Sequence, residues 1–255
     1  MNFMTTAKTD IGIKKQSNED SVTLKVADTD LGKAAFCLVC DGLGGLAKGE
    51  LASATLIKEF SDWFSARLPA LIYAGLDEVE LKNQWESIIY NQNLKIMQYA
   101  KGLNLNIGTT VAALLLFQGK YYAMSVGDSR VYFMSDSLYQ VTKDHSFVAR
   151  EIELGNITPE QAHVHPRRSV LLQCVGASPM VVPDFFSGEF ALGTVFMVCS
   201  DGFIHEVTTE EIWNSFNPAV LQSENIMYSN LSNLIEVNKQ RHETDNITVA
   251  LIKTY

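Results

Sequence analysis

The chain has 255 residues, 47% of them hydrophobic, and carries a formal net charge of −9 at pH 7. Its length suits one large layered domain, and its hydrophobic fraction is ordinary for a globular core. The acidic balance argues against nucleic acid and anionic membranes as partners, and leaves proteins, small molecules and cations. Neither a secretory leader nor an apolar run long enough to span a membrane is visible, so we expect a cytoplasmic protein.

The first part of the chain predicts strands at 5–12, 21–28 and 34–40. The third is entirely apolar and stops at Asp41, which is followed by three glycines within four residues. A carboxylate at the end of a buried strand is costly unless a cation meets it. An Asp followed by Gly is also an ordinary turn, and by itself this segment favours the turn.

Apolar residues at helical spacing predict helices at 50–68, ending before Pro69, and at about 77–102. The side chains expected to be buried are Leu51, Ala54, Leu56, Ile57, Phe60 and Phe64 in the first helix, and Leu81, Trp85, Ile88, Ile89 and Ile96 in the second.

Short β-rich runs then predict an antiparallel meander, with strands at 109–117, 121–126, 130–134 and 138–142. The polar segment 144–168 is expected to be irregular apart from a short helix that starts at Thr158-Pro159-Glu160. The last elements expected are strands at 184–189, 195–199 and 247–253 and helices at 209–216 and about 219–240. No repeat or linker interrupts the chain, so we expect residues 1–255 to form a single domain.

Four cysteines are present, Cys37, Cys40, Cys174 and Cys199. The first two form the only CxxC, and without a second such pair the sequence does not predict a zinc site. Positions three apart on a strand point to opposite faces, so Cys37 and Cys40 should not share a ligand. We expect four buried, reduced thiols.

Aspartates recur at the ends of the predicted strands. Asp41 and Asp201 each follow an apolar strand and precede a glycine, Asp245 opens the last strand, and Asp128 lies between two strands of the meander. Like charges gathered at one point would repel and raise one another's pKa unless a polyvalent cation neutralised them. Oxygen donors without a His or Cys set favour Mg²⁺ or Mn²⁺ over zinc. Each Asp alone is more often a turn residue, so the ordered set carries the hypothesis.

The motifs around these residues resemble those of the metal-dependent Ser/Thr protein phosphatases of type 2C, the PPM family, in their short bacterial form. Seven segments match in order: Asn18-Glu19-Asp20; Asp41-Gly42-Leu43-Gly44-Gly45 with Gly49-Glu50 and Ala52-Ser53; Gly108-Thr109-Thr110; Gly127-Asp128-Ser129-Arg130; Asp144-His145-Ser146; Ser200-Asp201-Gly202; and Asp245-Asn246-Ile247-Thr248. The resemblance covers nearly the whole chain. It implies an α+β fold, in which two antiparallel β-sheets pack as a central sandwich flanked by helices on both sides.

The resemblance also implies a reaction and its catalytic residues. The enzyme would hydrolyse phosphoserine and phosphothreonine in proteins by direct attack of a bridging metal-bound hydroxide. Asp41 would bridge two Mn²⁺ or Mg²⁺ ions, the Gly42 carbonyl would bind the first ion, and Asp201 and Asp245 would bind the second.

Other positions take supporting roles by the same resemblance. Glu19 would hold a metal-bound water, and Asp128 would share a third, weaker metal with Asp201. Arg130 is expected to pair with a carboxylate in its own loop rather than to touch substrate. The segment 144–168 resembles the family's flap, where substrate selection is expected to vary.

Two positions depart from the family. Lys15 stands where the family places an Arg to grip the phosphate, and its point charge should give a looser grip than a planar fork; Lys14 could compete for the role. Leu46 stands where bacterial members often have His. Protonation of the leaving group is then left to metal-bound water or to His145, although a loop histidine that only caps structure is the alternative.

The partners implied are phosphorylated proteins, including a Ser/Thr kinase and its substrates, and we expect a monomer. A tyrosine-phosphatase reading fails because no cysteine is followed by Arg six positions later. Two alternatives stay open: a catalytically silent relative that binds phosphoproteins as a regulatory module, and a two-metal hydrolase of small phosphate esters. Manganese-dependent release of phosphate from a phosphopeptide separates an enzyme from a silent module.

Overall fold

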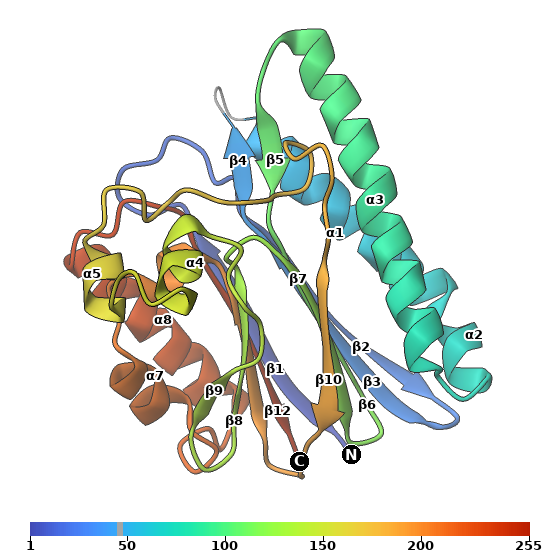
Figure 1. The fold of residues 1–255 in the computed structure, drawn as a ribbon. Helices are drawn as coiled ribbons and strands as arrows, with labels where there is room; N and C mark the ends of the chain where they lie inside the picture. Colours follow the sequence, from blue (N-terminus) through green and yellow to red (C-terminus); the bar gives the residue numbers. More distant parts are fainter. Residues whose placement is uncertain (45–47) are drawn as a thin grey trace.

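The computed structural model describes residues 1–44 and 48–255, so Leu46 lies outside the described residues. Two five-stranded antiparallel sheets pack face to face, and helices cover their outer faces (Figure 1). The α+β sandwich expected from the sequence is therefore confirmed.

The chain crosses between the two sheets several times, and each sheet contains strands that are far apart in the sequence. One sheet has the order β1-β12-β11-β8-β9, formed by Phe3–Asp10, Ile247–Thr254, Val195–Cys199, Arg130–Met134 and Leu138–Gln140. The other has the order β10-β7-β6-β3-β2, formed by Asp184–Glu189, Lys120–Val126, Val111–Phe117, Gly32–Cys40 and Ser21–Thr29. A separate two-stranded sheet pairs β4 (Gly42–Gly44) with β5 (Ile107–Thr109).

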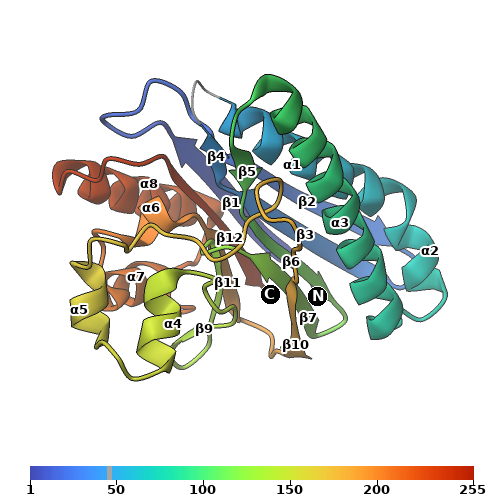
Figure 2. The same cartoon turned by 45° about the horizontal axis from the view of Figure 1, so that its top comes forward.

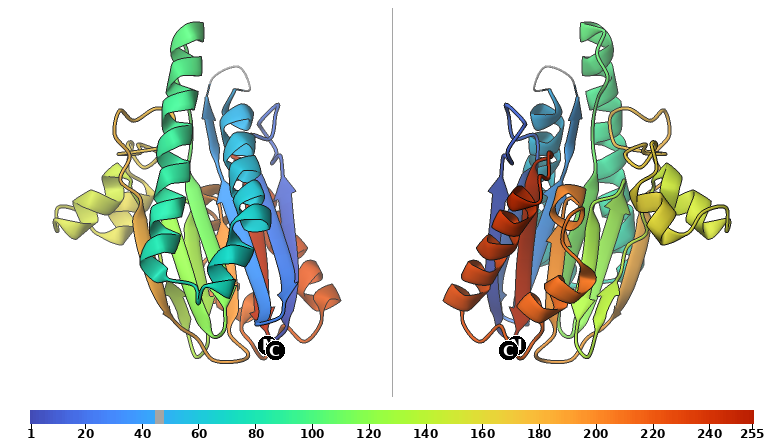
Figure 3. Two further views of the ribbon diagram at one scale, coloured as in Figure 1. Left: turned by 90° about the vertical axis from the view of Figure 1, so that its right-hand side faces the viewer. Right: turned by 90° about the vertical axis from the view of Figure 1, so that its left-hand side faces the viewer.

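Helices form the two outer layers (Figure 2). The sheet that contains β3 is covered by α1 (Gly49–Ala66), α2 (Leu68–Tyr73) and α3 (Glu78–Leu103). The sheet that contains β12 is covered by α7 (Thr209–Phe216) and α8 (Glu224–Gln240). The four-residue helix α6 (Asp201–Ile204) follows β11 directly, and the short helices α4 (Phe147–Glu153) and α5 (Pro159–His163) protrude from the sandwich (Figure 3).

Central strands are buried on both faces, which explains why their sequences are continuously apolar. On β3, Phe36, Leu38 and Cys40 pack beneath the helices, whereas Cys37 and Val39 face the opposite sheet. The two thiols of the CxxC thus point to opposite faces, and all four cysteines are free and buried, as the sequence predicted. Burial raises the pKa of the Cys37 thiol well above its usual value.

Some local expectations were wrong. Leu51 and Ala54 are exposed, because α1 is turned so that Ala52, Leu56 and Phe60, spaced by four residues, face the sheet. The chain does leave α1 before Pro69, but it begins α2 at once, with proline in the first turn where its missing N–H costs nothing.

Two further elements were not expected. Within the segment 144–168, α4 begins after Ser146, whose side chain accepts a hydrogen bond from the Ala149 N–H. The glycine-rich stretch that we expected to be a turn continues instead as an extended strand, because Gly42–Gly44 pairs with Ile107–Thr109.

The sheet register brings several strand ends to one edge of the sandwich. Cys199, the last residue of β11, pairs with Val249 near the start of β12 and with Arg130 at the start of β8. In the other sheet, Val39 near the end of β3 pairs with Ala112 near the start of β6. The residues that follow or precede these ends therefore meet at the edge opposite the chain termini (Figure 1).

No helix in the described part of the chain is both long and apolar enough to cross a membrane.

Phe36→Ala should lower the free energy of unfolding by about 3–5 kcal/mol, because it empties a fully buried site between sheet and helices. The Phe36 ring lies 6.1 Å from the Phe60 ring and 6.0 Å from the Trp85 ring, between centroids. Urea denaturation measures the loss. Tyr73→Ala, at a side chain that is 89% exposed, is the matched control and should change stability by less than about 0.5 kcal/mol. Equal losses in the two variants would contradict this account of the core.

Candidate active site

Aspartates from four connections converge at this edge. Asp41 follows β3, Asp128 lies between β7 and β8, Asp201 follows β11, and Asp245 precedes β12. Burial, together with the charges of Asp20, Asp201, Asp245 and Asp128, raises the pKa of Asp41 well above its usual value. The convergence expected from the sequence is therefore present, and the carboxylates are close enough to repel one another.

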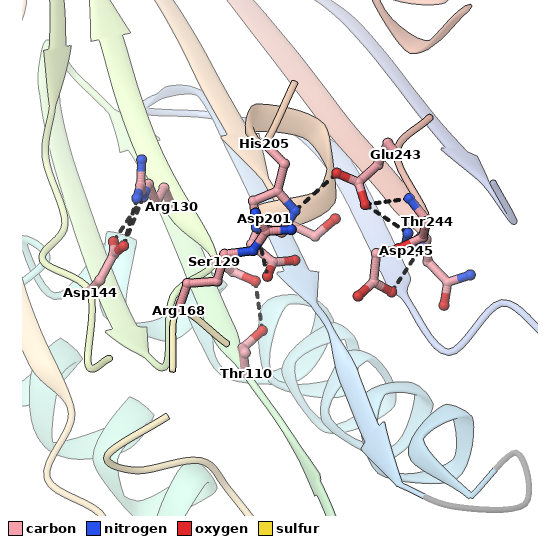
Figure 4. A network of polar contacts seen from close by, with 12 residues as sticks. Thr110, Ser129, Arg130, Asp144, Arg168, Asp201, His205, Glu243, Thr244 and Asp245 are labelled. Carbon is pink, nitrogen blue, oxygen red and sulfur yellow. Dashed lines mark hydrogen bonds and ion pairs between the residues drawn. The ribbon is translucent and has the colours of Figure 1, made fainter. Parts of the chain in front are cut away.

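Asp41 is fixed by the strand that lies beside it. Its N–H donates to Thr110 Oγ1 over 2.9 Å, and its carbonyl accepts from the Thr110 N–H and the Thr109 hydroxyl, each at 2.9 Å. The Thr110 hydroxyl also shares a hydrogen bond of 2.6 Å with Ser129, beside Asp128 (Figure 4). These bonds explain why threonines occur in the Gly108-Thr109-Thr110 motif.

Gly42 is required because three backbones meet at this point. A Cβ there would lie 2.4 Å from the carbonyl oxygens of both Glu19 and Gly49. The Glu19 carboxylate accepts from the Gly49 N–H at the start of α1 over 3.0 Å, and Glu19 is only 8% exposed. The first two sequence motifs are thus locked together, which holds Glu19 beside the candidate metal ligands.

A second glycine joins the loops of Asp201 and Asp245. A Cβ on Gly202 would lie 2.2 Å from the Asn246 carbonyl oxygen. The Asn246 side chain accepts from the Glu19 N–H over 2.9 Å and donates to the carbonyls of Ile11 and Ser17. Asn246 therefore connects the Asp245 loop to the first motif, although the two are far apart in the sequence.

Two buried carboxylate oxygens in the described structure have no hydrogen-bond partner, Asp201 Oδ1 and Asp20 Oδ1. The other oxygen of Asp201 pairs with His205 Nε2 at 3.3 Å, and the other oxygen of Asp20 accepts from the Ser200 hydroxyl at 2.8 Å. Burial raises the pKa of Asp20 to about 7. Burial alone would also raise the pKa of Asp201, but the hydrogen bond and charge of His205 lower it.

The site has a cation of its own in Lys15, whose Nζ lies 2.6 Å from Asp245 Oδ1. Burial lowers the pKa of this half-exposed lysine, but the hydrogen bond and charge of Asp245 outweigh it and raise the value. The sequence assigned Lys15 to the substrate phosphate, and in this structure its ammonium group pairs with Asp245. Lys14 makes no hydrogen bond or ion pair within the described residues.

The donor set fits a hard divalent cation. The free oxygens of Asp201 and Asp20 are buried acceptors without a partner, and oxygen atoms of this kind are the ligands that such cations prefer. Between residues 1–44 and 48–255, no three His, Cys, Asp or Glu side chains already lie at the spacing of a metal-ligand group. Asp245 pairs with Lys15, so a cation that bound to this carboxylate would have to displace the lysine.

Arg130 and His145 lie near the aspartates, and the polar atoms of both side chains are held by other protein groups. Arg130 forms a bidentate pair with Asp144, at 2.8 Å from Nε and 2.6 Å from Nη2, which agrees with its predicted role in its own loop. His145 Nδ1 accepts from Gln173 at 2.8 Å, and its Nε2 lies 3.2 Å from Asp184. Since both ring nitrogens of His145 have partners, its geometry favours a structural role over that of a general acid.

Three residues at this edge were not assigned a role from the sequence: Asp20, His205 and Glu243. Asp20 belongs to the first motif, so its position was a usable signal. His205 follows Asp201 by four residues, a spacing that places both on one helix face, but α6 is too short to be recognised from periodicity. Nothing in the sequence around Glu243 indicates its role, because its partner His205 lies 38 positions away.

A sandwich that gathers oxygen donors at strand ends suits a metal-dependent hydrolase of phosphate esters. The sequence model of the family described as "Protein phosphatase 2C" matches residues 13–233. The serine/threonine phosphatase stp of Listeria innocua is 30% identical over 249 residues, covering 96% of this chain and 94% of that protein. The serine/threonine protein phosphatase PstP of Mycobacterium tuberculosis is 29% identical over 96% of this chain, which spans 44% of PstP.

Solved structures of bacterial serine/threonine phosphatases have the same fold as this chain. Serine/threonine phosphatase Stp1 of Staphylococcus aureus superposes with a TM-score of 0.83 and 27% identity, over 100% of this chain and 96% of that one. The catalytic domain of PstP in complex with two manganese ions gives a TM-score of 0.78 and 27% identity, over 98% and 97% of the two chains. The chain belongs to the protein phosphatase 2C family. The enzyme class expected from the motifs, a protein phosphatase, is thereby confirmed.

Asp20→Asn should stabilise the metal-free protein, and more at about pH 7.5 than at about pH 4. The folded pKa of Asp20, about 7, lies above the ordinary value of 3.8. The penalty for burying its charge is therefore absent below about pH 3.8, grows as the pH rises from about 3.8 to about 7, and is fully present above that. Asparagine removes the charge while its oxygen can still accept from Ser200.

The melting temperature measures this effect, and it should rise by roughly 2–4 °C for each kcal/mol recovered. Mn²⁺ should stabilise the wild type more than the variant at the higher pH, because the cation relieves the same repulsion. Identical melting of the two metal-free proteins at about pH 7.5 would show that Asp20 carries no such penalty.

Proposed function

We propose that this phosphatase hydrolyses phosphoserine and phosphothreonine in proteins, with two Mn²⁺ or Mg²⁺ ions held by Asp41, the Gly42 carbonyl, Asp201 and Asp245. The observation that carries the proposal is Asp201 Oδ1, a buried acceptor with no partner in the described chain and with other carboxylates beside it. When bound, such cations would activate a water molecule and neutralise the phosphoryl oxygens.

The chain's own residues would orient the reaction. Asp41, fixed through its backbone by Thr109 and Thr110, would present its carboxylate to both ions from a rigid strand end. Gly42 would hold its own carbonyl toward an ion, because the backbones of Glu19 and Gly49 pack directly against it. In this assignment Glu19 would orient a water molecule through the oxygen that Gly49 does not use.

Lys15 would capture the phosphate at the rim of the site. Its side chain is 40% exposed, so Nζ can be reached from solvent, and it must leave Asp245 when a cation binds there. The released ammonium group would then be available to a phosphoryl oxygen as a point charge. Asp128 would share a third, weaker ion with Asp201, which is in keeping with the burial and the neighbouring charges of Asp201 and Asp144 that raise the pKa of Asp128.

We also propose that residues 1–255 act as a single catalytic domain in which the segment 144–168 forms a flap over the substrate. The likeness to named serine/threonine phosphatases supports phosphorylated proteins as substrates. Within that class we propose a Ser/Thr kinase and its targets, met by a monomeric enzyme in the cytoplasm.

The alternative of a silent phosphoprotein-binding relative has one feature in its favour, the lysine at position 15. Against it stand the three candidate ligands, Asp41, Asp201 and Asp245, which are all present. A hydrolase of small phosphate esters would use the same site, and it is distinguished by its preference among substrates.

The purified protein should release phosphate from a phosphothreonine peptide only when Mn²⁺ or Mg²⁺ is added. Asp201→Asn should reduce turnover by about 100-fold or more, because loss of a metal ligand removes several kcal/mol of transition-state stabilisation. Malachite-green detection of phosphate measures the rate, and a phosphorylated sugar serves as the comparison substrate. Equal activity of the variant and the wild type would exclude the enzyme proposal, whereas faster turnover of the sugar phosphate would favour the small-ester alternative.

Lys15→Arg should lower KM for the phosphopeptide and leave the affinity for Mn²⁺ nearly unchanged. A guanidinium group can meet two phosphoryl oxygens at once, whereas an ammonium group meets them as a point charge. Steady-state kinetics at saturating Mn²⁺ test this, with Lys14→Arg as the matched control. An unchanged KM in Lys15→Arg would mean that another group grips the phosphate.

A further inference from the structure

One imidazole and one carboxylate connect two of the candidate metal ligands (Figure 4). His205 Nε2 lies 3.3 Å from Asp201 Oδ2, and His205 Nδ1 lies 3.0 Å from Glu243 Oε2. The second oxygen of Glu243 accepts from the backbone N–H groups of Thr244 and Asp245, at 2.6 and 2.8 Å. A continuous chain of contacts therefore runs from the Asp201 side chain to the backbone of Asp245.

The local structure around Asp201 is weak without this support. The helix that carries Asp201 has four residues, so its own backbone bonds hold it poorly. Asn238 donates to the Phe203 carbonyl over 2.9 Å and steadies the helix backbone, but within the described structure it does not reach the Asp201 side chain. The rotamer of the Asp201 carboxylate therefore depends on His205.

Glu243 is too deeply buried for an incidental surface pair. Its side chain is 5% exposed, and a buried carboxylate is costly unless its oxygens are hydrogen-bonded. Here one oxygen accepts from the imidazole and the other from two backbone groups. The three bonds satisfy the carboxylate and fix the plane of the His205 ring at the same time.

We propose that His205, anchored by Glu243, is a positioning residue that holds Asp201 Oδ2 and thereby presents Oδ1 to the metal. Glu243 also fixes the backbone of Asp245, so a single carboxylate sets the relative placement of two ligand loops. The inference rests on the proposed metal site and extends it by two residues. Partners that orient metal ligands in this way typically change metal affinity by about 10–100-fold when they are removed.

Two replacements of His205 by amides of similar shape test whether its hydrogen bond to Asp201 matters, or only the volume that its side chain fills. The amide nitrogen of glutamine reaches the place of Nε2, whereas that of asparagine reaches only the place of Nδ1. His205→Gln therefore keeps a donor to Asp201, and His205→Asn keeps only a donor to Glu243. We expect Mn²⁺ to bind about tenfold more weakly to His205→Asn, and to His205→Gln within about threefold of the wild type.

The readout is the electron paramagnetic resonance signal of free Mn²⁺ during titration of the protein, which does not require turnover. His242→Asn is the control, because this neighbouring histidine is exposed and has φ 68°, a conformation that asparagine tolerates. With the phosphopeptide, His205→Asn should need more Mn²⁺ for half-maximal activity, while KM at saturating Mn²⁺ stays unchanged.

Glu243→Gln provides an independent measurement should His205→Asn fail to fold. Its oxygen can still accept from Thr244 and Asp245, but its amide cannot accept from the imidazole N–H, so Mn²⁺ affinity should again fall by about tenfold. If His205→Asn or Glu243→Gln bound Mn²⁺ as tightly as the wild type, the inference would be overturned and the proposed function would stand. Equal losses in His205→Asn and His205→Gln would overturn it as well. Absence of Mn²⁺ binding to the wild type would overturn both.

Discussion

The mutual repulsion of carboxylates at one edge of the sandwich is the constraint on which the site depends. Asp20, Asp41 and Asp201 lie so close together that each charge acts on the others, and burial withholds the water that would screen them. Such a group is stable only if it is protonated or meets a cation. The chain itself offsets part of this negative charge, through the contact of Lys15 with Asp245 and that of His205 with Asp201. A divalent cation would neutralise more of this charge than either of them.

The scaffold withstands this repulsion because it leaves the carboxylates little freedom to separate. Strand ends from both sheets meet at one edge, and the backbone around Asp41 is tied to the neighbouring threonines. Gly42 and Gly202 allow main chains to approach so closely that any side chain would collide with a carbonyl oxygen. The backbone of the site is thus fixed in advance, while the side chains of the candidate ligands keep other partners, such as Lys15 on Asp245.

Elements could be predicted from the sequence where neighbouring residues alone carry a clear hydrophobic pattern. The strands predicted at 34–40 and 109–117 could be recognised because β3 and β6, which form most of them, are buried on both faces and hence apolar. The pairing of Gly42–Gly44 as a strand was not readable, because its partner lies more than sixty residues away and glycine has little strand propensity. Leu51 and Ala54 were wrongly predicted to be buried because α1 has apolar residues on more than one face. Only its contact with the sheet decides which of these faces is buried.

The sequence by itself determined the family, the order of the motifs and the aspartates at the strand ends, since these are properties of short segments that keep their meaning anywhere along a chain. Tertiary structure alone decided the burial of Asp20, the contact between Lys15 and Asp245, and the link from Asp201 through His205 to Glu243. The physical reason is the same in each case. Hydrogen bonds and charge interactions act over a few ångströms in space, and the folding of two sheets against each other sets which distant residues come within that range.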